Sequence, residues 1–267
     1  MKKLFTLMLT VLMSLTAVFG LTACSLFDKP ETKGVITVGY TDYAPMNYEE
    51  NGELVGFDTE LAKKVFTELG YTVRFKLIEW SQKYMELDSG TIDCVWNGFT
   101  ANSYDNDTPR NQLVDFSKYY MQNAQCIVRL SSSSDISSWE QMSAQTVAYE
   151  AGSAADSLVN DNITETTLSK GVLSQMEAIK EVKLGTANYA VVDILLAQAI
   201  CGKGDFANLT INTGINLGIE YYAVGFKKGS DLTAQVNAKF DDLTQNGFVQ
   251  ELAAKYKLEN ALLLGRN

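Results

Sequence analysis

The chain has 267 residues, of which 46% are hydrophobic and 20% are charged, an ordinary balance for a globular protein. Its 32 acidic and 22 basic residues give a formal charge of −10, and no stretch is strongly basic, which argues against nucleic-acid binding. The sequence contains no histidine. Catalysis by Ser-His or Cys-His pairs and histidine-ligated metal sites are therefore excluded.

The first residues, MKKLFTLMLTVLMSLTAVFGLTAC, have the form of a secretory signal: two lysines, a long apolar run, and small residues before a cysteine. The segment Leu21-Thr22-Ala23-Cys24 is similar to a bacterial lipobox, which predicts a signal peptide over residues 1–23 and a lipid on Cys24. The alternatives are an ordinary signal peptide with a cysteine near its end, or an uncleaved anchor. Residues 24–33 are expected to form a polar tether.

Strand and helix signals alternate after the tether. Runs rich in β-branched residues predict strands, and apolar residues at helical spacing predict helices. Asp58 is the expected N-terminal cap of the first helix, and Gly70 is its stop. The order β-α-β-α-β predicts a parallel sheet with helices on its faces. The expected strands are 34–40, 71–78 and 91–96, and the expected helices are 57–70 and 81–90.

A second alternating series follows. Ser174 and Glu177 fit a capping box that opens a helix running to about Leu184. The segment 146–161 reads as a strand, a glycine turn and a helix. The other expected strands are 125–130, 189–193 and 220–226, and the other expected helices are 194–200, about 231–245 and 247–256.

Three cysteines follow Cys24, namely Cys94, Cys126 and Cys201. An odd number in an exported protein allows one disulfide at most, and free, buried thiols are the simpler interpretation. Their spacing fits no zinc site.

Six segments follow one another along the chain: DYAPMNYEENGELVGFDTELAKKVFTELG, TIDCVWNGFT, RNQLVDFSKYYM, VAYEAGS, YAVVD and GIEYYAVGFKKGSDL. In this order they resemble the polar amino-acid-binding proteins of ABC importers, the extracytoplasmic solute-binding proteins of family 3. The resemblance covers about residues 34–256.

This resemblance implies a periplasmic-binding-protein-like α/β fold: two α/β lobes joined by a two-strand hinge, with a ligand cleft between them. Lobe 1 would comprise residues 34–128 and 220–267, and lobe 2 residues 129–219. The implied function is capture of a free, polar L-amino acid and its delivery to an ABC transporter permease. The protein would be a monomer anchored to the cell membrane through Cys24, without a cofactor, a metal or nucleic acid.

A free amino acid is a zwitterion, so its carboxylate needs a bidentate donor and N–H groups, and its ammonium needs a carboxylate. By the resemblance, Arg110 would clamp the ligand carboxylate, and Asn97, Gly98 and Thr100 would add polar contacts. The alternative for Arg110 is a surface arginine on a loop. The family usually has about five residues between the threonine and arginine positions, whereas here Arg110 follows Thr100 by ten.

Asp193 matches the acid that pairs with the ligand ammonium, although an aspartate before a helix also suits an N-terminal cap. The turn Gly152-Ser153-Ala154 matches a glycine turn at a helix N-terminus, where backbone N–H groups bind anions. The family often has Ser or Thr at the Ala154 position, so the backbone alone would serve here.

Tyr43 and Trp80 are expected to form aromatic walls against the ligand. The alternative is that both are ordinary core residues. Asp42 and Glu79 flank them, and either contact a cationic side chain of the ligand or are simply solvated.

Two rival functions remain. An enzyme on the same fold, of the dehydratase or cell-wall lyase type, would need Glu or Lys as its acid or base. A sensor lobe of a signalling protein would need a following membrane helix and effector domain, which the sequence to Asn267 does not show. Neither is expected.

Overall fold

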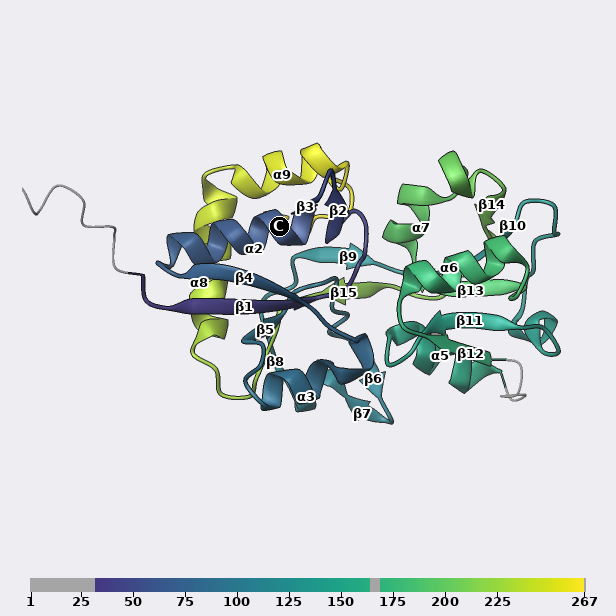
Figure 1. Cartoon of the computed structure of the whole chain (residues 1–267), viewed down its shortest axis with the longest axis horizontal. Helices are drawn as coiled ribbons and strands as arrows, with labels where there is room; N and C mark the ends of the chain where they lie inside the picture. Colours follow the sequence, from purple (N-terminus) through teal and green to yellow (C-terminus); the bar gives the residue numbers. More distant parts are fainter. Residues whose placement is uncertain (1–31, 164–168, 267) are drawn as a thin grey trace, which may run out of the picture. The chain divides into compact units, whose positions relative to one another are not determined.

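The structure is a computed structural model that describes residues 32–163 and 169–266. The expected signal peptide, Cys24 and the tether up to residue 31 lie outside the described residues. Two five-stranded sheets, each flanked by helices, confirm the predicted two-lobed α/β fold (Figure 1). Within the described ranges, no helix combines the length and the apolar character that crossing a membrane requires.

The first sheet combines the N-terminal part of the described chain with strands from later in the sequence. In spatial order its strands are β4 (Thr72–Leu77), β1 (Val35–Tyr40), β5 (Cys94–Val95), β16 (Gly225–Phe226) and β8 (Asp115–Phe116). β1 is parallel to β4 and β5, whereas β16 is antiparallel to both of its neighbours. The longer helices of this lobe are α2 (Phe57–Glu68), α3 (Lys83–Asp88), α8 (Leu232–Gln245) and α9 (Phe248–Tyr256).

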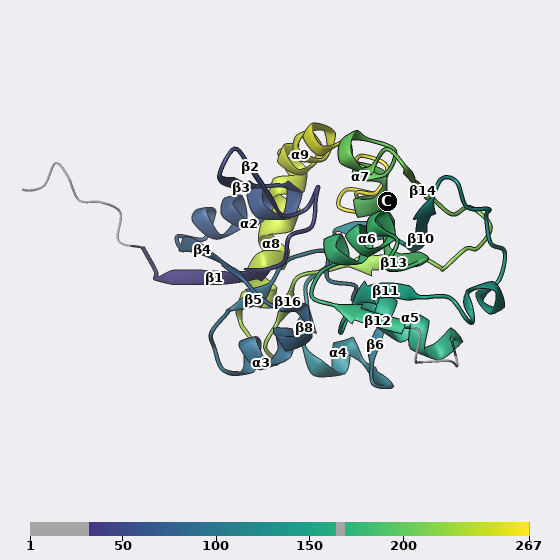
Figure 2. The ribbon, with the colours of Figure 1, turned by 45° about the vertical axis from the view of Figure 1, so that its right-hand side comes forward.

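The second sheet is built from the middle of the chain. In spatial order its strands are β12 (Ser169–Val172), β11 (Val147–Glu150), β13 (Tyr189–Asp193), β10 (Gln125–Leu130) and β14 (Leu209–Ile211). β11 is parallel to β12 and β13, and β10 is antiparallel to β13 and β14. Figure 2 shows α6 (Gln175–Leu184) and α5 (Ala154–Asn162) on opposite sides of this sheet, and α7 (Ile194–Ile200) follows β13 directly.

The chain passes between the sheets twice, and the two passages pair with each other. β9 (Met121–Asn123) and β15 (Glu220–Tyr222) form an antiparallel two-stranded ribbon. β9 leads through Ala124 into β10, all six residues of which belong to the second sheet. The predicted strand 220–226 is therefore two strands, β15 in the ribbon and β16 in the first sheet. At Ala223 and Val224 the chain changes partners, from β9 to β5 and β8.

Most local predictions are confirmed, but the cap of α2 is not. Helices α6 to α9 and strand β13 fall where the sequence places them, and Ser174 caps α6 through the backbone N–H of Glu177 at 3.1 Å. The N-terminal cap of α2 is Gly56, not Asp58. Asp58 is completely buried, and its carboxylate instead accepts hydrogen bonds from the Gly98 N–H and the Tyr120 hydroxyl, each at 2.8 Å.

The long segment between Thr100 and Arg110 folds as a small hairpin. β6 (Tyr104–Asp105) pairs with β7 (Thr108–Pro109), and the two turn residues between them both have positive φ, as in the tight turns that suit hairpins. Helix α4 (Arg110–Leu113) follows at once. The remaining elements are β2 (Tyr48–Glu50), β3 (Glu53–Val55), η1 (Trp80–Gln82), η2 (Trp139–Met142) and η4 (Gly204–Phe206).

Candidate functional site

A cavity lies where strand ends of the two sheets meet, the usual place for a ligand in open α/β sheets. Residues from both lobes line it: Trp80, Asn97, Gly98, Arg110, Glu150, Ser153, Ala154, Gln175 and Asp193. Seven of these nine are residues that the sequence predicts for the site, and Glu150 and Gln175 are additional. Its volume is only about 10 Å³, so in this conformation the cavity has room for about one water molecule.

Arg110 reaches this cavity despite the long segment that precedes it. Its side chain is 1% exposed, which excludes the surface-arginine alternative. Its Nε and one terminal nitrogen donate to Asp105 Oδ1 at 3.2 and 2.9 Å, and its other terminal nitrogen donates to Thr100 O at 3.2 Å. The hairpin thus loops out and leaves Arg110 in the cavity wall, but it also brings a carboxylate onto the guanidinium.

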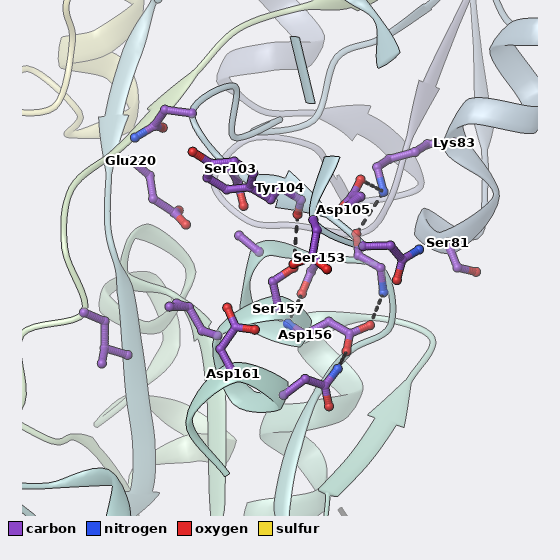
Figure 3. Close-up of a pocket in the computed structure, with 18 of the residues that line it drawn as sticks. Ser81, Lys83, Ser103, Tyr104, Asp105, Ser153, Asp156, Ser157, Asp161 and Glu220 are labelled. Carbon is purple, nitrogen blue, oxygen red and sulfur yellow. Dashed lines mark hydrogen bonds and ion pairs between the residues drawn. The ribbon is translucent and has the colours of Figure 1, made fainter. Parts of the chain in front are cut away.

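Lys83 is a second buried cation beside Arg110, and sequence reasoning missed it. Its Nζ donates to Gly152 O of the second lobe at 2.8 Å. The same atom lies 3.4 Å from Asp105 Oδ2, and Figure 3 shows the Lys83 and Asp105 side chains side by side. Burial, and then the positive charge of Arg110, lower the pKa of Lys83 to about 8. In the sequence Lys83 is an ordinary residue of a short polar helix, so only its burial reveals it.

The polar residues after β5 hold the wall of the cavity through their own hydrogen bonds. The Asn97 amide accepts from the Thr41 N–H and hydroxyl and donates to Asn47 Oδ1 at 2.8 Å. Gly98 has φ +57, and a Cβ there would lie 2.6 Å from the Tyr43 ring, so this position requires glycine. Asn97 therefore fixes the loop, and Gly98 lets the loop approach Tyr43.

Thr100 does not line the cavity, although it lies close to it. Its side chain is buried, and its hydroxyl donates to Glu220 Oε2 at 3.2 Å. Its carbonyl oxygen accepts from Arg110. Thr100 thus connects the arginine to the acid at the start of β15.

The turn at α5 is occupied mainly by contacts within itself. The Ser153 side chain caps α5 by accepting from the Asp156 N–H at 3.3 Å, and the Gly152 N–H donates to Asp156 Oδ2 at 2.7 Å. The Ser153 N–H donates to Glu150 O. Ser153 and Ala154 line the cavity. Gly152 does not line it, and its carbonyl oxygen accepts the hydrogen bond from Lys83.

Asp193 points into the site, not onto its helix. It stands at the N-terminal cap position of α7, yet its side chain makes no capping hydrogen bond. Its carboxylate instead accepts from the side-chain amides of Asn123 at 3.0 Å and Gln175 at 2.7 Å, and from that of Gln125. The geometry therefore favours the cleft over the cap as the place where this carboxylate acts.

Two further buried acids, Glu150 and Glu220, gather near Asp193. Glu150 Oε1 is buried without a hydrogen-bond partner among the described residues. Burial, and then the charge of Asp193, raise the pKa of Glu150 to about 8 and that of Glu220 to about 7. Burial also raises the pKa of Asp193. Three acids lie near two cations, Lys83 and Arg110, both of which are already paired with Asp105.

The predicted aromatic residues are both buried, but only one lines the cavity. Trp80 does so from the start of η1, next to Phe99 at a ring distance of 5.2 Å. Tyr43 lies behind Gly98, and its hydroxyl is 2.7 Å from that of Tyr222. Asp42 and Glu79 are exposed and do not line the cavity. The described residues contain no acid or cysteine group suited to hold a metal, and Cys94, Cys126 and Cys201 are unpaired.

Two α/β lobes with a polar, charged cavity at their facing strand ends define a solute-binding protein. Residues 36–259 match the family model of the bacterial extracellular solute-binding proteins, family 3. The chain belongs to this family, as the sequence resemblance predicts.

Similar proteins share the same architecture and most of the length. The arginine-binding extracellular protein ArtP of Bacillus subtilis is 26% identical over 256 residues, which cover 93% of this chain and 96% of ArtP. A substrate-binding protein of an ABC uptake transporter from Streptococcus pneumoniae, solved with bound histidine, is 29% identical with a TM-score of 0.74, covering 83% of this chain and 92% of that one. An ancestral arginine-binding protein bound to arginine is 28% identical with a TM-score of 0.76, and the match covers 85% of this chain and 99% of that protein.

Proposed function

We propose that this protein captures a free, polar L-amino acid outside the cytoplasm and delivers it to an ABC transporter permease. One observation carries the proposal: Arg110 from the first lobe and Asp193 from the second line one cavity. Such a pair complements the two charges of a zwitterion, since a guanidinium binds a carboxylate and a carboxylate binds an ammonium. The amino-acid-binding relatives and solved structures support the same substrate class.

Capture would occur by closure of two lobes about the ribbon of β9 and β15. We assign residues 34–123 and 220–266 to lobe 1 and residues 125–219 to lobe 2. The boundary predicted at residue 128 is corrected, because it falls inside β10, which pairs entirely within the second sheet. A ligand that bridges the lobes binds the closed conformation better and shifts the population towards it, and the permease would recognise that shape. The contact from Lys83 to Gly152, and that from the Ser157 hydroxyl to Tyr104 O at 3.0 Å, already join the lobes. The protein would act as a monomer.

A ligand screen tests this function. A panel of the twenty L-amino acids should include at least one that raises the melting temperature, because a ligand at 100 times its dissociation constant stabilises by about 2.7 kcal/mol. Deaminated analogues of the same compounds are the matched controls and should stabilise much less. If no L-amino acid stabilises the protein, the proposed substrate class is wrong.

No chemical step is needed for this function, and we propose that the protein is not an enzyme. Lys83 and Glu150 are the groups that an enzyme would use, because burial moves both pKa values towards neutrality. Mass spectrometry after prolonged incubation should recover the bound amino acid unchanged. A converted product would favour a dehydratase or lyase on the same fold instead.

We also propose that the mature protein is anchored to the cell membrane through a lipid on Cys24. The lipobox-like segment ending at Cys24 supports this, and so does an extracellular family. Replacing the residue by serine, Cys24→Ser, should remove the lipid site and release the protein from membranes or block its processing. Fractionation that finds this variant processed and membrane-bound like the wild type would contradict the anchor.

A further inference from the structure

The pairing of Arg110 with Asp105 affects how a ligand can bind. We propose that Asp105 is a built-in competitor for the ligand carboxylate: its own carboxylate occupies the Arg110 guanidinium until a ligand displaces it. This inference rests on the proposed function and specifies how the same site sets its affinity and selectivity.

The donors of Arg110 are nearly used up by the protein. Of the five N–H groups of a guanidinium, two are directed to Asp105 Oδ1 and one to Thr100 O. A further contact to Gly152 O is longer, at 3.4 Å. While Asp105 stays in place, a ligand carboxylate therefore cannot receive the bidentate pair of hydrogen bonds from Nε and the adjacent terminal nitrogen.

Asp105 is held by three groups of the first lobe at once. Its Oδ2 accepts from the Tyr84 hydroxyl and lies near Lys83 Nζ, while its Oδ1 faces Arg110. The side chain is only 14% exposed. A carboxylate that binds two cations and a hydroxyl in a buried place has the same contacts that a ligand carboxylate would need.

The hairpin that carries Asp105 contacts the second lobe, and a groove beside it leaves space into which the Asp105 side chain can rotate. Tyr104, its neighbour in β6, accepts a hydrogen bond from the Ser157 hydroxyl of α5, as Figure 3 shows. Asp105 also borders a wider groove between the hairpin and α5. The side chain can therefore turn into this groove without passing through the cavity beside Asp193.

Competition of this kind lowers affinity only for ligands that bring a carboxylate. An amine without a carboxylate does not compete with Asp105 for Arg110, so this ion pair does not lower the affinity for the amine. An amino acid must first displace Asp105, so its apparent affinity is reduced by the fraction of molecules in which Arg110 is free. Removing the charge of Asp105 should raise affinity for carboxylate ligands selectively.

Calorimetry with three proteins tests this: the wild type, Asp105→Asn, and Asp107→Asn as a matched control. Asp107 is an exposed aspartate of the same hairpin, so its substitution removes the same charge without touching Arg110. The probes are the amino acid found in the screen and its decarboxylated amine. Asp105→Asn should bind the amino acid at least about tenfold more tightly, because hydrogen bonds to charged groups contribute that much. Its affinity for the amine, and both affinities of Asp107→Asn, should stay near the wild-type values.

Each other outcome overturns the inference in a distinguishable way. If the wild type binds amino acids and Asp105→Asn binds them equally or more weakly, Asp105 only positions Arg110, and the proposed function stands. Equal tightening for amino acid and amine would show a general loosening of the hairpin. If neither protein binds any amino acid, the proposed function and this inference both fail. Asp105→Ala repeats the test should the asparagine variant not fold.

Discussion

The Asp193→Asn variant is expected to bind amino acids at least about 100-fold more weakly than the wild type, because removing one partner of a buried charge pair costs several kcal/mol. Asparagine keeps the shape of the side chain but cannot neutralise the ligand ammonium. A deaminated analogue has no ammonium, so its affinity should change by no more than about threefold, the scale of a weak neutral contact. Calorimetry with both ligands measures the two ratios.

The deaminated analogue also distinguishes the loss of the Asp193 charge from a structural disturbance of the site. Asn123, Gln125 and Gln175 all donate to Asp193, and an asparagine there loses one acceptor oxygen. If that loss disturbs the site, both ligands will weaken equally, and Asp193 would then be a positioning residue for the amides. Asp161→Asn, at an exposed position of α5 in the same lobe, is the matched charge control. It should leave both affinities unchanged.

The ligand-free protein is expected to lose stability as the pH rises from about 4.5 to about 8, the interval between the ordinary pKa of Glu150 and its folded value. In this interval the folded state holds a proton that the unfolded state has released, so the free energy of unfolding falls with pH. Glu220 and Asp58, each with a pKa raised to about 7 by burial, act in the same direction.

Glu150→Gln should remove the part of this slope that belongs to Glu150. The variant should exceed the wild type in stability at pH 8 by a few kcal/mol at most, on the order of the pKa shift converted to free energy. At pH 4.5 the two should be nearly equal, because the wild-type residue is then protonated when folded. Urea unfolding at both pH values measures this, with Glu53→Gln at an exposed site of β3 as the control.

Two other groups contribute to the pH dependence in different ways. The pKa of Asp135 is lowered, first by its hydrogen bond with Arg129, so its contribution is lost only under more acidic conditions. Lys83 is half deprotonated in the folded state at about pH 8, where the unfolded state still holds its proton, so at the upper end of the interval it acts in the opposite direction. A pH slope that is the same in wild type and Glu150→Gln would mean that Glu150 is ionised in its buried position.

The sequence by itself determined the order of the elements and much of the site. Periodicity and capping are local, so α6 to α9 and β13 begin and end close to the expected residues. Strand ends in an α/β fold converge, and the family resemblance therefore identified most residues that line the cavity, including Arg110 and Asp193.

Tertiary structure alone decided which partner each polar group takes. Asp58 looks like a cap in the sequence, but the approach of Gly98 and Tyr120 from distant segments gives its carboxylate other donors. Nothing local distinguishes Lys83 or Glu150 from a solvated charge, because burial depends on what packs over them.

The same holds for Asp105. The unusual gap of ten residues before Arg110 was visible in the sequence, but not the hairpin register that places this carboxylate on the guanidinium. Periodicity reports which face of an element is apolar, whereas a charge pair depends on the positions of two side chains in space, and those exist only once the chain has folded.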